Sequence, residues 1–173
     1  MKKLLGMILT LALAAGLAWP VYAESSTVPP EVTAHAYLVM DAQTGQVLVQ
    51  KGGAERNYPA SITKIMTLAL AMEKCGGDMT QQVTVSPDAV YSLEAGSSHV
   101  ALQPGEVVSL NDLFHATILA SANDAANVLA EYTAGSMEAF VELMNAKAAE
   151  LGLAGTHFVN ANGLHRPDHY TTP

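Results

Sequence analysis

The segment from Ser61 to Lys74 restricts the fold more than any other part of this 173-residue sequence. It has the spacing of a helix, and Gly76 and Gly77 mark its end. Its apolar residues fall on nearly every side of that helix, namely Ile62, Ile65, Met66, Leu68, Leu70 and Met72. A helix without a polar face is normally buried inside a domain. We therefore expect 61–74 to be a central, buried helix.

A β-hairpin is predicted ahead of this helix. Residues 37–40 and 46–50 are strand-like, and Thr44-Gly45 supplies the turn. An isolated hairpin is marginally stable in water and needs further strands. Apart from the short candidate strand "QQVTVS", the sequence offers none. We therefore expect the chain to be the front portion of a larger domain.

Three more helices are predicted in the second half. The first begins at Ser109, which forms a capping pair with Asp112, and runs to about Ala120. The second extends from near Asp124 to just before Gly135, and the third covers roughly 137–151. Residues 88–105 have a mixed pattern that supports no assignment beyond loops, and "THFVNANGLH" is expected to be a short extended piece with an Asn-Gly turn. One strand pair followed by several helices indicates an α+β fold.

The first 23 residues have the pattern of a secretory signal peptide. Lys2 and Lys3 precede an apolar run of about 16 residues, shorter than the roughly 20 that span a bilayer, so export is favoured over a membrane anchor. Val21-Tyr22-Ala23 predicts cleavage after Ala23. Residues 24–33 are expected to be a linker.

Composition excludes several classes of function. Without the two leader lysines the chain keeps 6 basic against 16 acidic residues, a net charge near −10, which argues against a nucleic-acid partner. Cys75 is the only cysteine, so no internal disulfide is possible, and its apolar surroundings favour a buried side chain over a nucleophile. His165 and His169 are separated by Pro167, so we expect neither a zinc site nor a cofactor.

The nonapeptide "PASITKIMT" places Ser61 three residues before Lys64. Residues three apart share a helix face, so the amine can reach the hydroxyl. Serine needs a base to attack at neutral pH, and burial would lower the pKa of the lysine enough for it to serve. The alternative is a helix-capping Ser61 beside a solvated Lys64.

A second pair of polar residues lies between two predicted helices. Ser121 and Asn123 are two residues apart, and in a tight turn both can face one cleft. The hydroxyl can relay a proton, and the amide can bind a substrate carbonyl. The alternative is a plain turn in which Asp124 caps the next helix.

S-x-x-K with S-x-N about 60 residues later resembles the penicillin-binding serine acyl-enzymes. The flanks are similar to those of the low-molecular-mass D-alanyl-D-alanine carboxypeptidases, peptidase family S11. The matching stretches are "MDAQTGQVL", "PASITKIMT", "SANDAANVLAE", "GSMEAFVELMNAKAAELGLAGTHFVNANGLH" and "HYTTP". The resemblance covers nearly all of 34–173, and it implies a β-lactamase/transpeptidase-like fold in which a helical cluster packs on an antiparallel sheet.

The resemblance also implies roles. Ser61 matches the acylated nucleophile, Lys64 its general base, Ser121 the proton relay and Asn123 the substrate-binding amide. Family members remove the terminal D-alanine from peptidoglycan pentapeptides through an acyl-serine, and β-lactams acylate the same serine. The family's third motif, K-T-G, does not occur here. We therefore expect 34–173 to be the N-terminal portion of the catalytic domain, inactive alone, with any membrane association in the missing C-terminal part.

Two other functions stay open at this point. A class A β-lactamase shares the S-x-x-K, but it favours Ser-Asp-Asn where this chain has Ala122. A non-catalytic cell-envelope binding module with vestigial motifs is the third possibility.

Overall fold

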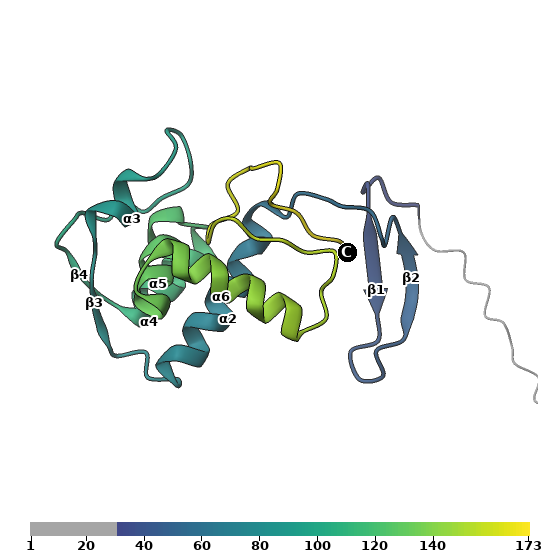
Figure 1. Ribbon diagram of the computed structural model, residues 1–173, viewed down its shortest axis with the longest axis horizontal. Coiled ribbons are helices and arrows are strands. Elements are labelled where there is room, and N and C mark those ends of the chain that lie inside the picture. The colour runs from purple at the N-terminus through teal and green to yellow at the C-terminus, as the bar shows by residue number, and fades with distance from the viewer. Residues whose placement is uncertain (1–30) are drawn as a thin grey trace, which may run out of the picture. The chain divides into compact units, whose positions relative to one another are not determined.

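The structure, a computed structural model, describes residues 31–173 (Figure 1). The predicted signal peptide and most of the predicted linker lie outside this part. Residues 34–173 form one compact unit. Its elements are β1 (Tyr37–Met40), β2 (Val47–Lys51), the 3-10 turn η1 (Ala60–Ile62), α2 (Thr63–Cys75), β3 (Gln82–Thr84), α3 (Pro87–Tyr91), β4 (Val107–Ser109), α4 (Leu110–Leu119), α5 (Asn123–Ala134) and α6 (Met137–Glu150).

Helix α5 is the centre of the helical cluster. It packs against α2, α3, α4 and α6, and most of its residues are buried. Three of these buried residues, Ala125, Ala126 and Ala130, are alanines, which let neighbouring helices approach closely. Core side chains from the surrounding helices include Leu70, Ala71, Leu110, Leu113, Phe140 and Met144. The central helix of the unit is therefore α5.

Our prediction that 61–74 is buried on all sides was wrong. Ile62, Ile65 and Met72 are 67%, 64% and 42% exposed, whereas the polar Thr63, Lys64 and Thr67 lie on the buried face. These polar groups are buried because they have hydrogen-bond partners on another segment; the Thr67 hydroxyl, for example, donates to the Ala161 carbonyl at 2.6 Å. The buried face of α2 thus carries polar side chains that could take part in a reaction.

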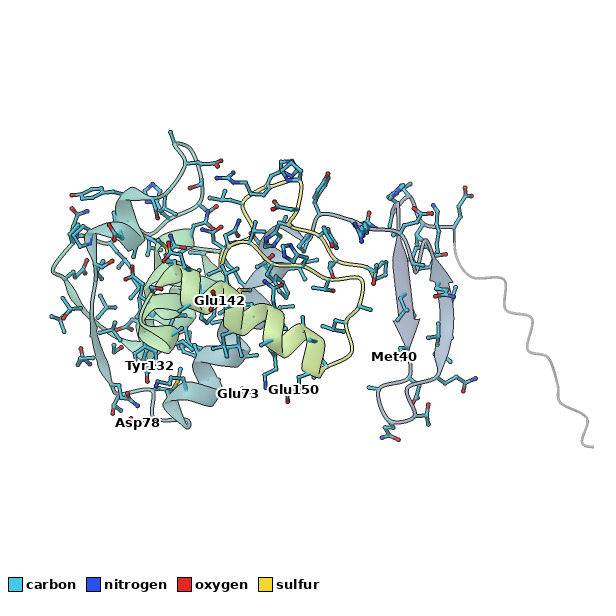
Figure 2. The ribbon with its side chains drawn as sticks, in the orientation of Figure 1. Met40, Glu73, Asp78, Tyr132, Glu142 and Glu150 are labelled. Carbon is cyan, nitrogen blue, oxygen red and sulfur yellow. The ribbon has the colours of Figure 1, made fainter. Side chains whose placement is uncertain are left out.

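Strands β1 and β2 form the predicted antiparallel hairpin, with β2 displaced by one residue from its predicted bounds. Tyr37 pairs with Lys51, and the register shifts between Val39 and Met40. In the turn, the Asp41 carboxylate accepts hydrogen bonds from Gln43 and Thr44. No residue of either strand is buried, and Met40, which Figure 2 labels, is 52% exposed.

The segment around 80–110 contains more structure than expected. Strands β3 and β4 form a second antiparallel pair, which includes the predicted "QQVTVS" strand. Helix α3 lies where no helix was predicted, and its start is capped by Ser86, whose hydroxyl accepts from the Ala89 N–H. The predicted Ser109 cap of α4 is confirmed, since its hydroxyl accepts from the Asp112 N–H at 3.1 Å.

Ion pairs at the outer surface join α6 to α2. The Lys147 ammonium lies 3.3 Å from the Glu73 carboxylate on α2 and 3.0 Å from Glu150 on its own helix, and both carboxylates are labelled in Figure 2. None of the helices within 31–173 combines the length and the apolar character needed to cross a membrane.

Candidate active site

Ser61 lies in η1, directly before α2. The residue ahead of it, Ala60, has a φ of 47°, a left-handed conformation that side chains disfavour. The Ser61 side chain is exposed at the surface. Its Oγ accepts hydrogen bonds from two groups, Lys64 Nζ at 3.2 Å and Ser121 Oγ at 2.8 Å. The backbone thus presents an accessible hydroxyl that already contacts two polar partners.

Lys64 lies on the first turn of α2 and is only 3% exposed. Its Nζ donates to Ser61 Oγ and, at 2.7 Å, to the carbonyl oxygen of Asn162. Within the described part of the chain it has no ion pair with a carboxylate. Burial therefore acts unopposed and lowers the pKa of Lys64 from 10.5 to about 8. The solvated Lys64 of the alternative interpretation is excluded.

Ser121 lies in the tight connection between α4 and α5. Its φ is 53°, so it too has a left-handed backbone conformation. Such strain persists only where the surrounding structure enforces it, and it is concentrated at functional sites. Here the strained turn brings the hydroxyl to Ser61, 60 residues away in the sequence.

Asn123 is the first residue of α5 and is 4% exposed. Its backbone N–H donates to the Ser98 carbonyl at 2.9 Å. Among residues 31–173 no hydrogen bond joins its side-chain amide to another protein group. The next residue, Asp124, does not cap α5. Its carboxylate instead accepts from the N–H groups of Val100 and Leu102 and so holds the loop beside the site.

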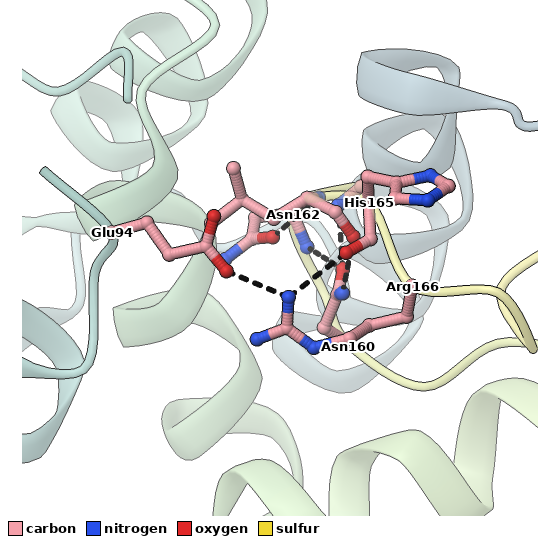
Figure 3. Close-up of polar contacts among 7 residues, drawn as sticks. Glu94, Asn160, Asn162, His165 and Arg166 are labelled. Atoms are coloured by element: carbon pink, nitrogen blue, oxygen red, sulfur yellow. Dashed lines mark hydrogen bonds and ion pairs between the residues drawn. The ribbon is translucent and has the colours of Figure 1, made fainter. Parts of the chain in front are cut away.

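A loop near the end of the chain supplies a group that the sequence did not predict. Figure 3 shows its polar contacts. Asn160 accepts from the Gly163 N–H at 2.7 Å and donates to the Leu164 carbonyl at 2.8 Å. Arg166 forms an ion pair with Glu94 at 2.6 Å. Hydrogen bonds within the loop and the ion pair at its C-terminal end thereby hold the loop in place. The carbonyl of Asn162 in this loop faces Lys64.

Gly163 brings this loop against the backbone beside the nucleophile. Its φ is 86°, and a Cβ at this position would lie 1.9 Å from the carbonyl oxygen of Ala60. Only glycine allows that approach. The Asn-Gly turn was predicted, but its contact with Ala60 was not, because nothing local connects two segments about 100 residues apart.

His169 forms a hydrogen bond with Thr63, the first residue of α2. Its Nδ1 accepts from the Val159 N–H at 3.1 Å, so Nε2 carries the proton and donates to Thr63 Oγ1 at 2.7 Å. Burial lowers the pKa of His169, which keeps the ring neutral. His165 instead contacts the Tyr58 ring. Within 31–173, no three His, Cys, Asp or Glu side chains come together as they would to hold a metal ion.

The arrangement suits acyl transfer. An exposed hydroxyl contacts a buried amine whose pKa is about 8, and a second hydroxyl contacts the first. A base near the working pH accepts a proton efficiently from the attacking group, and a relay hydroxyl can move that proton onward. Neither step requires a metal ion or an organic cofactor.

Comparison with known proteins gives consistent results. The profile of peptidase family S11, D-alanyl-D-alanine carboxypeptidase, matches residues 23–173. The D-alanyl-D-alanine carboxypeptidase DacC of Escherichia coli K12 is 40% identical over 156 residues, which is 87% of this chain and 39% of that protein. DacF of Bacillus subtilis 168 is 34% identical over 175 residues, 99% of this chain and 45% of that protein.

A solved structure, that of penicillin binding protein 6B from Escherichia coli, superimposes with a TM-score of 0.79 at 36% identity. The match covers 86% of this chain and 49% of that one. The chain thus spans less than half the length of these relatives. The expected α+β, transpeptidase-like fold class is confirmed. We conclude that the chain belongs to the D-alanyl-D-alanine carboxypeptidase family, peptidase S11.

Proposed function

We propose that this chain carries the acylation centre of a serine-type D-Ala-D-Ala carboxypeptidase, which removes the terminal D-alanine from peptidoglycan pentapeptides. One observation carries the proposal: Ser61 Oγ lies 3.2 Å from the amine of a buried lysine and 2.8 Å from a second hydroxyl. Membership of peptidase family S11 supports the substrate class.

In the proposed reaction, the neutral Lys64 amine takes the proton of Ser61 as Oγ attacks the carbonyl carbon of the D-Ala-D-Ala bond. The C–N bond then breaks, and Ser121 passes a proton from the Lys64 ammonium to the departing D-alanine amine. Water hydrolyses the acyl-serine with Lys64 again acting as base. Asn123, at the start of α5, is the proposed partner of a substrate amide or carbonyl.

The same centre accounts for the expected inhibitors, and the predicted signal peptide accounts for the expected compartment. A β-lactam carbonyl would acylate Ser61 by the same attack, because its ring C–N bond stands in for the peptide bond. Peptidoglycan lies outside the cytoplasmic membrane, and the signal peptide predicted at 1–23 fits export to that compartment. The acidic net charge, −8 for the whole chain, disfavours nucleic acid as a partner.

Release of D-alanine from a synthetic pentapeptide ending in D-Ala-D-Ala tests the activity, and it is measured on a protein that carries the K-T-G motif as well as this chain. We expect release that disappears in Ser61→Ala, together with a stable covalent penicillin adduct. Rapid turnover of penicillin would identify a β-lactamase instead. Peptidoglycan binding without an adduct or D-alanine release would identify a non-catalytic binding module. Either of these two results would overturn the proposal.

A further inference from the structure

Asn127 on α5 is a buried polar residue with no part in the mechanism above. It is 3% exposed, and its side-chain amide joins two segments that are distant in sequence. Its Nδ2 donates to the Ala89 carbonyl at 3.0 Å and to Ser92 Oγ at 3.3 Å. Its Oδ1 accepts from Nδ2 of Asn162 at 3.1 Å. The hydrogen-bonding groups at both ends of this amide are therefore occupied.

These partners fix the orientation of the amide. Turning it over would place Oδ1 against the Ala89 carbonyl oxygen and set two NH2 groups face to face at Asn162. Both contacts are repulsive, and a buried amide without partners is destabilising. Asn127 therefore presents its oxygen to Asn162 in one defined orientation.

Asn162 is in turn held by both ends of its side chain. Its Oδ1 accepts from the Leu164 N–H at 2.9 Å, while its Nδ2 donates to Asn127. The backbone carbonyl of the same residue accepts from Lys64 Nζ at 2.7 Å. A continuous path of hydrogen bonds thus leads from α5 through Asn162 to the amine that contacts Ser61.

We propose that Asn127 is a positioning residue that, through Asn162, holds the Lys64 amine in the orientation needed to take the proton of Ser61. This inference rests on the function proposed above. A neutral amine has two N–H bonds and one lone pair. With one N–H directed to the Asn162 carbonyl, the lone pair is free to face Ser61 Oγ. If that carbonyl shifts, the amine rotates, and reaction from the bound state slows.

Asn145 provides a matched control. It is also a helical asparagine that binds the same C-terminal segment, since its Oδ1 accepts from the Phe158 N–H at 2.9 Å and its Nδ2 donates to the Phe158 carbonyl at 2.8 Å. It has no hydrogen bond to Asn162 or Lys64. Replacing Asn145 should therefore weaken the fold without disturbing the amine.

The experiment compares Asn127→Leu with Asn145→Leu in a purified protein that carries the K-T-G motif as well as this chain. Two quantities are measured: the second-order rate of Ser61 acylation by penicillin, and the titration of Lys64 followed by the 13C resonance of its Cε. We expect acylation about tenfold slower in Asn127→Leu, because proton transfer depends on aligned groups. We also expect the Lys64 titration midpoint to fall by about half a unit, because the untethered Asn162 carbonyl accepts less well from the ammonium.

Asn162→Ala is the second variant, in case Asn127→Leu does not fold. It removes the tether but keeps the backbone carbonyl, so it should reproduce both effects. Equal rates and equal midpoints in the Asn127, Asn145 and wild-type proteins would overturn the inference while leaving the proposed function intact. Absence of acylation in the wild type would overturn the proposed function, and the NMR titration would still decide whether Asn127 acts on Lys64.

Discussion

The helical cluster and the β1–β2 hairpin have similarly apolar sequences, but the apolar side chains of the cluster are buried and those of the hairpin are largely exposed. Around α5, residues such as Leu113, Leu129 and Phe140 are completely buried. In the hairpin, Val39, Val47 and Leu48 are 50%, 45% and 61% exposed. Within residues 31–173, every hydrogen-bond partner of the Ser61 and Lys64 side chains lies in the helical cluster or in the C-terminal loop, and none lies in the hairpin.

The difference shows where a strained site can persist. Ala60 and Ser121 both have positive φ values, and Lys64 is buried without a carboxylate partner in the described part of the chain. Each of these features is unfavourable locally. Tight packing and a connected hydrogen-bond network can enforce them, whereas a hairpin without buried side chains cannot. The same kind of substitution should therefore have a larger effect in the cluster than in or beside the hairpin.

The largest difference is expected between two lysines. Lys64→Arg should slow acylation by penicillin by a factor of about 10² to 10⁴, because arginine stays protonated and cannot act as the base. Lys51→Arg should leave the rate unchanged, since the hydrogen bond of the Lys51 side chain within residues 31–173 goes to the Ala34 carbonyl, away from the site. Stopped-flow acylation rates, with circular dichroism to verify folding, decide the comparison. Equal rates in the two variants would remove Lys64 from the mechanism.

The same lysine predicts a pH dependence. Because burial lowers the pKa of Lys64 to about 8, the neutral base is the minor form at pH 7 and the major form at pH 9. The acylation rate should therefore rise with pH and level off above a midpoint near 8. A midpoint near the ordinary value of 10.5 would mean that Lys64 is solvated in the working protein.

Two leucines test the packing itself. Leu129→Ala removes a side chain from the fully buried side of α5 and should lower the free energy of unfolding by about 2–5 kcal/mol. Leu48→Ala, at an exposed position of β2, should lower it by about 0.5 kcal/mol or less. Urea unfolding of both variants measures these changes in the free energy of unfolding. Comparable losses would show that the hairpin is packed as firmly as the cluster.

Two glycines test the strained loop. Gly163→Ala places a Cβ against the Ala60 carbonyl at positive φ, and we expect a loss of about 3 kcal/mol or more together with slower acylation. Gly45 in the hairpin turn also has positive φ, but there is open space around it, so Gly45→Ala should lose only about 1–2 kcal/mol. Thermal unfolding and acylation rates of both variants are measured. Equal losses of stability and equal acylation rates would refute the contact between Gly163 and Ala60.

The smallest effect is expected for two histidines. The pKa of His169 is lowered by burial, so the unfolded chain binds the proton more readily than the folded one. Its contribution to stability is complete above pH 6.5 and is lost as the pH falls through the lowered pKa. His169→Gln should therefore weaken the pH dependence of unfolding below pH 6.5. His35→Ala, which removes an exposed pair with Glu55, should change stability by about 0.5 kcal/mol or less. An unaltered pH dependence in His169→Gln would contradict this role.

The sequence predicted local features well and long-range contacts poorly. Strand β1, the Ser109 cap and the bounds of α5 and α6 follow from propensity and capping, to within about two residues at each end. The Ser61–Lys64 contact followed from helical spacing. The exposed face of α2 was missed because hydropathy alone ranks Ile62 and Ile65 above Thr67. Thr67 is buried because the Ala161 carbonyl, 94 residues away, accepts its hydroxyl.

The same limit applies to the site. Ser121 and Asn123 were identified from an unusual pair in a turn, and the structure brings Ser121 to Ser61. The contributions of Asn162, Gly163 and His169 depend on a loop that contacts α2 across about 100 residues of sequence. Within that loop, the Asn-Gly turn was the one local signal, and it predicted a bend without indicating what the bend would touch.

The position of the penicillin adduct tests the central claim most directly. A purified protein that carries the K-T-G motif as well as this chain is treated with penicillin, and its intact mass is measured. The modified peptide is identified by fragmentation, with Ser61→Ala as the control. The account predicts one adduct per chain, on the peptide that contains Ser61, and none in the variant. An adduct on Ser121, or one that persists in Ser61→Ala, would contradict it.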